Sequence, residues 1–201
     1  MTIYDLKPRF QALLRPLVVH LHAIGVTANQ VTLAACALSL VLGIALCMQA
    51  SRPTLFLLLP LWLFLRMALN AVDGMLAREF GQKSDLGAFL NELTDVVSDV
   101  ALYLPFAYLP HFGWLEVVLA IFLAVVTEMT GTVAVMVRAS RRYDGPMGKS
   151  DRAFALGALG LAVGLGMPPA AWQKVIFPVL SVLLVVTIFN RVRRALDEVG
   201  R

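Results

Sequence analysis

Residues 54–77 read TLFLLLPLWLFLRMALNAVDGMLA, and this run changes character along its length. Its first half is almost wholly apolar, as in a helix that crosses a bilayer, for which about 20 apolar residues are needed. Its second half carries Arg66, Asn70 and Asp73 among apolar neighbours. Ionisable groups are costly inside a membrane and usually mark a functional site. The run therefore predicts a membrane-spanning helix that ends in a polar site.

The composition of the whole chain agrees with a membrane protein. Of its 201 residues, 59% are hydrophobic and 15% are charged, and the mean hydropathy is +0.79. A soluble domain is about 45–50% apolar and about 25% charged. A chain of this length has no room to hide so much apolar surface from water. We therefore expect an integral membrane protein made of a single membrane domain, residues 1–201.

Including residues 54–77, six segments are long and apolar enough to cross about 30 Å of hydrocarbon. We expect an all-α fold with six transmembrane helices, at residues 29–50, 54–77, 86–109, 114–137, 152–170 and 172–190. Residues 2–20 differ from these segments, because apolar residues recur there at helical spacing beside basic ones. The apolar residues are Phe10, Leu13, Leu14, Leu17 and Val18, and the basic ones are Lys7, Arg9 and Arg15. This pattern predicts an N-terminal interfacial amphipathic helix.

The basic residues predict the orientation, since Lys and Arg concentrate on the cytoplasmic side. With six spans both termini share one side, and that side receives fourteen of the 17 Lys and Arg residues: Lys7, Arg9, Arg15, Arg78, Lys83, Arg138, Arg141, Arg142, Lys149, Arg152, Arg191, Arg193, Arg194 and Arg201. The opposite side receives only Arg52 and Lys174. We expect both termini and the polar site to be cytoplasmic, in a bacterial inner membrane. The net charge of +4 then reflects contact with anionic lipid headgroups and not nucleic-acid binding.

Polar residues recur at helical spacing on both sides of the turn that follows residue 77. Asn70 and Asp73 are three residues apart, whereas Asn91, Asp95 and Asp99 follow one another at intervals of four. Such spacings put side chains on one face of a helix. Two helices joined by a short turn are antiparallel neighbours, so the two polar faces are expected to converge.

Clustered carboxylates repel one another, and a bound divalent cation commonly relieves that repulsion. With oxygen ligands and no His or Cys nearby, the expected ion is Mg²⁺ or Mn²⁺, which in turn suits a phosphate-containing substrate. Gly74, Ala77 and Gly87 flank the polar positions. Glycine permits the close approach of a ligand or of a second backbone, although each of these residues alone is also typical of ordinary helix packing.

The spacing of this region resembles the signature of the CDP-alcohol phosphotransferases, Asp-x2-Asp-Gly-x2-Ala-Arg-x8/9-Gly-x3-Asp-x3-Asp. The chain has Asn70-x2-Asp73-Gly74-x2-Ala77-Arg78-x8-Gly87-x3-Asn91-x3-Asp95. All spacings agree, and six of the eight fixed positions have the same residue. The stretch Val26-Thr27-Ala28-Asn29-Gln30-Val31-Thr32 also resembles the family's Thr-Pro-Asn-x-x-Thr motif, with Ala28 in place of proline.

The resemblance implies an enzyme that binds a CDP-linked substrate through one or two divalent metal ions and releases CMP. It implies that Asp95 is the base that deprotonates an acceptor hydroxyl. Metal binding would fall to the four signature acid positions, Asn70, Asp73, Asn91 and Asp95. The residues implied to bind the CDP group are Asp73, Gly74, Ala77, Arg78 and Gly87, with Asn29 and Thr32 as weaker candidates.

Asn70 and Asn91 depart from the family, because each replaces a signature aspartate. An amide oxygen still ligates a hard cation, but two formal negative charges are lost. Three interpretations remain open: an enzyme that uses one metal ion or binds its metal weakly, an enzyme that recruits Asp85, Glu92 or Asp99 instead, and a protein that binds nucleotide or lipid without turnover.

The acceptor side is less clear from the residues. Lys149 and Arg152 either hold a phosphate of the acceptor or are ordinary cytoplasmic flanking charges. Arg66 and Glu128 either pair with each other or line the acceptor pocket. Gly160-x3-Gly164 allows close helix contact, within the chain or in a homodimer, as is common in the family.

The sequence thus predicts a membrane transferase of phospholipid biosynthesis. CDP-diacylglycerol is the expected donor because an enzyme embedded in lipid needs a substrate dissolved in the membrane. A soluble CDP-amino-alcohol with a lipid acceptor is the second choice. The rival class is a non-catalytic protein that binds lipid or CDP-nucleotide; a transporter is disfavoured because the polar cluster lies near one face and not at a broken helix pair.

Overall fold

The computed structural model describes residues 3–168 and 172–200, with side chains from Phe10 onward. Residue 2 of the expected interfacial helix, residues 169–170 of the expected fifth span, Arg201 and the side chains of Lys7 and Arg9 lie outside this description. The described residues form seven α-helices and three short 3-10 helices: α1 (Ile3–Ala23), α2 (Ala28–Met48), η1 (Pro53–Leu57), α3 (Leu58–Glu79), α4 (Asp85–Tyr103), η2 (Leu104–Tyr108), α5 (Trp114–Val133), η3 (Ala134–Val137), α6 (Lys149–Gly164) and α7 (Trp172–Glu198).

The helices confirm an all-α integral membrane protein. Within the described ranges, four helical stretches are long and apolar enough to cross a membrane: Ala28–Met48, Pro53–Glu79, Trp114–Val137 and Trp172–Glu198. Helix α4 contains Glu92, Asp95 and Asp99, and α6 has only 16 residues. Because α4 is too charged and α6 too short to qualify by composition and length alone, the expected number of six spans stays a prediction.

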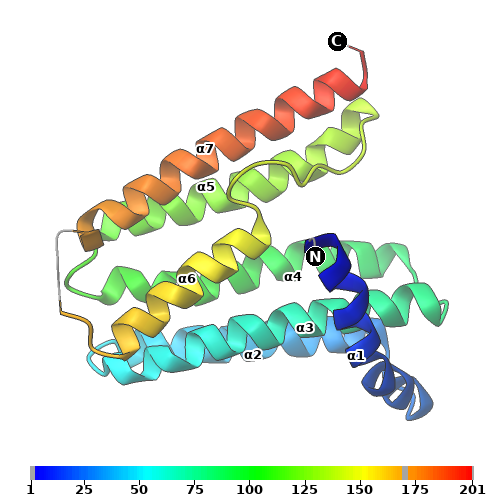
Figure 1. The fold of residues 1–201 in the computed structure, drawn as a ribbon, viewed down its shortest axis with the longest axis horizontal. Coiled ribbons are helices and arrows are strands. Elements are labelled where there is room, and N and C mark those ends of the chain that lie inside the picture. Colours follow the sequence, from blue (N-terminus) through cyan, green and yellow to red (C-terminus); the bar gives the residue numbers. More distant parts are fainter. Residues whose placement is uncertain (1–2, 169–171, 201) are drawn as a thin grey trace.

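Helix α1 crosses the other helices instead of running along them (Figure 1). Its Leu14 and Val18 pack against α3, whereas Leu13 and Leu17 are exposed. Arg15 forms an ion pair with Glu79 at the end of α3, with 2.7 Å between Nη1 and Oε2. The helix therefore has one face on the bundle and a second apolar face without a protein neighbour, as the interfacial interpretation requires.

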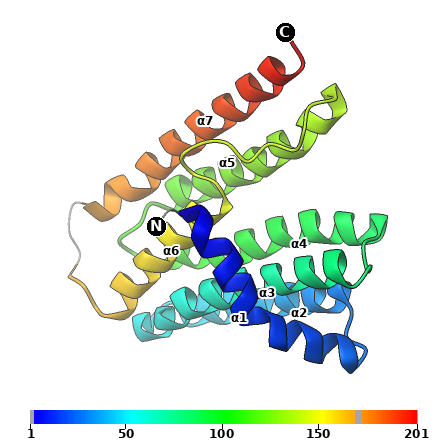
Figure 2. The same ribbon diagram turned by 45° about the vertical axis from the view of Figure 1, so that its right-hand side comes forward.

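The remaining helices form two groups joined by α6. Helices α2, α3 and α4 pack together, α5 pairs with α7, and α6 packs on α3 between the groups (Figures 1 and 2). A cluster of buried aromatic rings, Phe56, Phe106, Phe112 and Phe177, packs together near the connections that precede α3, follow α4 and precede α7. The opposite end of the bundle carries the α3–α4 turn and the first residues of α2, α4 and α6.

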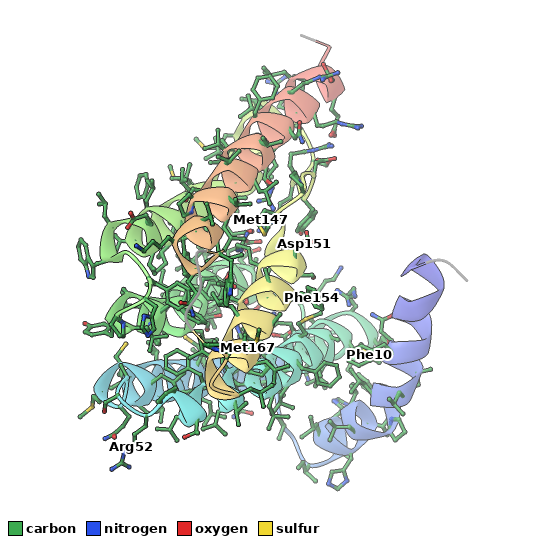
Figure 3. The ribbon with its side chains drawn as sticks, turned by 60° about the vertical axis from the view of Figure 1, so that its left-hand side comes forward. Phe10, Arg52, Met147, Asp151, Phe154 and Met167 are labelled. Atoms are coloured by element: carbon green, nitrogen blue, oxygen red, sulfur yellow. The ribbon has the colours of Figure 1, made fainter. Side chains whose placement is uncertain are left out.

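Helix α6 is shorter than the span expected at 152–170. It begins at Lys149 and ends at Gly164, and Gly166 then adopts φ 70°. This left-handed conformation, followed by Pro168, ends the helix because neither residue continues helical geometry easily. Figure 3 labels Met147 and Asp151 where the chain enters α6 and Met167 just beyond its end.

Gly160 and Gly164 of α6 pack against η1 and α3 of their own chain. A Cβ atom at Gly160 would lie 3.1 Å from Leu59 Cβ, and one at Gly164 would lie 2.6 Å from Leu57 Cγ. Of the two interpretations of this glycine pair, the internal one is confirmed, because the glycines let α6 approach η1 and α3. Homodimer formation stays a prediction.

Candidate active site

A cavity of about 900 Å³ lies at the end of the bundle that carries the α3–α4 turn. Helices α2, α3, α4 and α6 supply most of its wall. The α3–α4 turn, the loop before α6 and single residues of α5 and α7 complete it. Eleven of the twelve residues predicted for the site line this cavity: Asn29, Thr32, Asn70, Asp73, Gly74, Ala77, Arg78, Gly87, Asn91, Asp95 and Lys149. The twelfth, Arg152, is buried beside the cavity.

The entry of α2 is fixed by local hydrogen bonds. Thr27 caps the helix, since its backbone N–H donates to Gln30 Oε1 at 2.9 Å and its hydroxyl accepts from Gln30 N at 3.3 Å. The N–H of Ala28 donates to Gln82 Oε1 at 2.7 Å, a bond that proline could not make. The departure from proline therefore ties α2 to the α3–α4 turn.

One wall of the cavity joins α2 to Asp73. The Thr32 hydroxyl donates to Asp73 Oδ2 at 2.7 Å, and both side chains are buried. This bond satisfies one oxygen of a carboxylate that would otherwise be costly to bury. Asp73 thus faces the cavity in a defined orientation.

Two glycines make room for polar side chains of the cavity. A Cβ atom at Gly74 would lie 2.9 Å from Arg78 Nη2, and one at Gly87 would lie 2.9 Å from Asn29 Oδ1. The Arg78 guanidinium therefore lies over the Gly74 backbone, and the Asn29 amide lies against the first turn of α4. Ser84 caps that turn by accepting from Gly87 N at 3.0 Å.

Asp95 is held by polar groups from two other helices. Its Oδ1 accepts from Arg66 Nη2 at 3.1 Å and from Asn70 Nδ2 at 3.4 Å, and its Oδ2 contacts the ammonium group of Lys149. The expected convergence of the α3 and α4 polar faces is confirmed by the Asn70 contact. The Lys149 contact brings α6 to the same carboxylate.

Beneath Asp95 a network of buried ion pairs connects five helices. Arg66 and Arg152 bind the two oxygens of Asp99 at 2.6 and 2.9 Å. Arg152 and Arg191 share Glu128 Oε1 at 2.9 and 3.5 Å. One interpretation of the sequence was that Arg66 and Glu128 pair with each other, and this is wrong. The two residues belong to the same network, in which Asp99 and Arg152 connect them.

The network also bears on the carboxylates suggested as substitutes for Asn70 and Asn91. Both oxygens of Asp99 are engaged by arginine, and Glu92 binds Arg141 through two hydrogen bonds of 2.5 and 2.6 Å. Asp85 lines the cavity but is exposed at the start of α4. Asp99 and Glu92 are therefore already engaged by arginine, and recruitment of Asp85 stays a prediction.

The side chains do not fit the metal centre that the resemblance implies. Asp73 and Asp95 are the only carboxylates at the four signature positions, and cationic groups contact both oxygens of Asp95. Across residues 3–168 and 172–200, no three Asp, Glu, His or Cys side chains converge in a group that could hold a metal ion.

Arg141, Tyr143 and Arg191 also line the cavity, and the sequence alone did not single them out. Arg141 lies over the Tyr143 ring, 4.4 Å from its centroid. Burial disfavours the charged guanidinium, but the hydrogen bond and charge of Glu92 outweigh it, so the pKa of Arg141 lies above its usual range. In the sequence, Arg141 and Arg191 stood out only as two of many basic residues, and Tyr143 carried no signal.

Three helices begin at the cavity. Ala28 and Asn29 open α2, Asp85 and Gly87 open α4, and Lys149 opens α6, and all five residues line it. The partial positive charge of a helix N-terminus favours anions such as phosphate. Together with Arg78 and Lys149, these termini make the cavity suitable for a phosphate-containing ligand.

Comparisons with known proteins agree on the class of molecule. The profile of the family described as CDP-alcohol phosphatidyltransferase matches residues 25–189. The chain is 51% identical over 196 residues to the inner membrane protein YnbA of Escherichia coli (strain K12), covering 98% of this chain and 97% of that protein.

Two crystal structures of Mycobacterium tuberculosis phosphatidylinositol phosphate synthase (PgsA1) share the fold. The form with CDP-DAG bound has a TM-score of 0.73 and 20% identity, covering 92% of this chain and 94% of that one. The complex with manganese and citrate has a TM-score of 0.75 and 20% identity, covering 92% and 90%.

Proposed function

Because this chain belongs to the CDP-alcohol phosphatidyltransferase family, we propose that it transfers a phosphatidyl or other phospho-alcohol group from a CDP-linked donor to an acceptor hydroxyl, releasing CMP. The observation that carries the proposal is the cavity itself. All six retained signature residues line it, together with the first turns of three helices. A cavity of about 900 Å³ is also within the range of small-molecule and cofactor sites, about 300–1,000 Å³.

In this proposal the diphosphate of the donor lies near Arg78 and the three helix N-termini. Asp95 accepts the proton of the acceptor hydroxyl, whose oxygen forms a bond to the phosphorus that carries the donor alcohol. The bond between that phosphorus and the CMP oxygen breaks, and CMP leaves with the bonding electrons. General-base assistance of this kind contributes typically about 10²–10⁴-fold to a rate.

A second cavity supports a donor that is dissolved in the membrane. It has a volume of about 250 Å³, lies between α3 and α6, and shares Asn70, Lys149 and Ser150 with the main cavity. Its other lining residues include apolar Leu63, Met67, Ala71 and Ala153. Arg66 also lines this cavity, so half of its lining residues are polar and half are apolar. The apolar half suits an acyl chain, so CDP-diacylglycerol is the proposed donor.

We further propose that residues 1–201 form one membrane domain with six spans, a cytoplasmic site and both termini in the cytoplasm of a bacterium. The ends of the helices that surround the cavity carry most of the Lys and Arg residues, in agreement with the positive-inside rule. The related protein of Escherichia coli is named an inner membrane protein. A fluorescent or enzymatic reporter fused after residue 201 tests the orientation directly.

The proposed function is tested by purifying the protein in detergent and measuring CMP release from CDP-diacylglycerol with a panel of alcohols. We expect CMP to appear only when donor and a suitable acceptor are both present. The second candidate is non-catalytic binding, which is favoured by the contacts that Arg66 and Lys149 make with Asp95. CDP binding without CMP release from a CDP-lipid or a CDP-amino-alcohol would establish it instead.

Gly87→Ala is expected to weaken CDP binding about tenfold, or roughly 1.4 kcal/mol, with a small change in thermal stability. The added methyl group would lie 2.9 Å from Asn29 Oδ1 and 3.0 Å from Ser84 Oγ, so both polar groups must shift. Isothermal titration calorimetry with CDP measures the effect. Gly157→Ala is the matched control, because its Cβ would meet Pro60 Cα at an ordinary 3.5 Å. Equal CDP affinities for the two variants would show that Gly87 and Asn29 do not contribute to CDP binding.

A further inference from the structure

The ion pairs around the signature helices carry an excess of positive charge without a metal ion. One connected set contains four carboxylates and five cationic side chains: Glu92, Asp95, Asp99 and Glu128 with Arg66, Arg141, Lys149, Arg152 and Arg191. With all groups ionised, this set has a formal charge of +1.

Lys149 is the member of this set with the greatest freedom to exchange partners. Its side chain is 30% exposed, against 19% for Arg141 and at most 4% for the three other arginines. Within the described part of the chain its one ion pair is to Asp95, whereas Arg66, Arg141 and Arg152 each bind two carboxylates. An ammonium group on a flexible stem has three donors and accepts several geometries.

The position of Lys149 matches the place where charge has been lost. It contacts Asp95 and lines the main cavity beside Asn70 and Asn91, the two neutral amides at signature positions. An ammonium group cannot be a ligand of a cation, but it binds a phosphate oxygen strongly. Its contact with Asp95 also competes with any metal ion for that carboxylate.

We propose that Lys149 takes the place of a divalent metal ion, binding the diphosphate of a CDP group so that the site holds its nucleotide without metal. This inference rests on the proposed function for the identity of the ligand. The ammonium group moves from Asp95 Oδ2 to a phosphate oxygen when the nucleotide enters. Asp95 Oδ2 is then free to accept the proton of an acceptor hydroxyl, so the nucleotide must bind before the acceptor.

The test is isothermal titration calorimetry of the full-length protein in detergent, with CDP as the probe, in EDTA and in excess Mg²⁺ or Mn²⁺. Wild type is expected to bind CDP in EDTA, with a dissociation constant within about threefold of the value in metal. Lys149→Met should bind CDP at least about tenfold more weakly in EDTA, since it loses a charge-assisted hydrogen bond. Lys149→Arg should stay within about threefold of wild type, because the positive charge is kept.

Lys174→Met is the matched control and should bind CDP as wild type does, because Lys174 is an exposed residue at the opposite end of the bundle. The triple variant Asn70→Asp, Asn91→Asp, Lys149→Met restores the signature charges and should bind CDP only when Mg²⁺ or Mn²⁺ is present. Wild-type binding that vanishes in EDTA and returns with metal would overturn the inference. So would a Lys149→Met variant that binds as well as wild type in EDTA.

Failure of this inference is separable from failure of the proposed function. Metal-independent CDP binding that depends on Lys149, without CMP release from any donor, would leave the inference standing and refute the transferase. CMP release together with strictly metal-dependent CDP binding would support the transferase and refute the inference about Lys149. The absence of CDP binding under both conditions would overturn both.

Discussion

Asp95→Asn is expected to reduce the rate of CMP release by at least about a hundredfold, the lower end of what general-base catalysis supplies. The amide has nearly the same shape as the carboxylate but does not accept the proton of an acceptor hydroxyl. It also lacks the charge that holds Arg66 and Lys149 at the cavity. The measurement is CMP release from CDP-diacylglycerol under single-turnover conditions, with CDP binding measured on the same preparation.

Asp197→Asn is the control for Asp95→Asn. Asp197 is exposed near the end of α7, where it has a single 3.8 Å ion pair with Arg193, and it lies outside the cavity lining. The same substitution there should leave the rate of CMP release unchanged. An Asp95→Asn protein with full activity would refute the assignment of Asp95 as the base.

Arg152→Met is expected to lower the free energy of unfolding by about 3–5 kcal/mol, as is usual when one partner of a buried ion pair is removed. Arg152 is 3% exposed and binds both Asp99 and Glu128 at 2.9 Å. Methionine fills a similar volume but leaves two buried carboxylates with fewer partners. Thermal unfolding in detergent can be followed with a thiol-reactive dye, because Cys36 is buried and Cys47 is half-buried.

Arg193→Met provides the comparison, because Arg193 is 69% exposed and, among the residues that the structure describes, pairs only with Asp197 at 3.8 Å. That change should stay within about 0.5 kcal/mol of wild type. Combining Arg152→Met with Glu128→Gln should recover part of the loss, which a double-mutant cycle measures. Equal melting temperatures for Arg152→Met and Arg193→Met would show that the buried network contributes nothing to stability.

The helix pair that carries the signature could be predicted from the sequence because its arrangement depends only on residues close together in the chain. The spacings of Asn70 with Asp73 and of Asn91 with Asp95 define faces on two helices that a five-residue turn makes neighbours. The membrane character followed from composition, and the apolar face of α1 from its periodicity. These features depend on residues a few positions apart, and at that distance helical geometry alone determines which side chains share a face.

The partners of the intramembrane charges could not be predicted in the same way. Arg66 binds Asp99, and Glu128 binds Arg152 and Arg191, but the sequence offered several carboxylates and arginines at suitable depth. The choice depends on the packing of helices that lie far apart in the chain. Lys149 reaches Asp95 only because the irregular loop after Arg138 brings α6 back to the cavity, and no periodicity describes that loop.

The buried ion pairs also bear on the way the protein enters the membrane during synthesis. Arg66 lies in α3, and its partners Asp95 and Asp99 lie in the next helix, so the two helices can insert as a hairpin with the charge already neutralised. The partners of Arg152 and of Arg191 all precede them in the sequence. Since an unpaired charge in a bilayer is costly, we expect α6 and α7 to enter against a preformed acidic surface. The carboxylates are therefore synthesised, and can enter the membrane, before Arg152 and Arg191, which they neutralise.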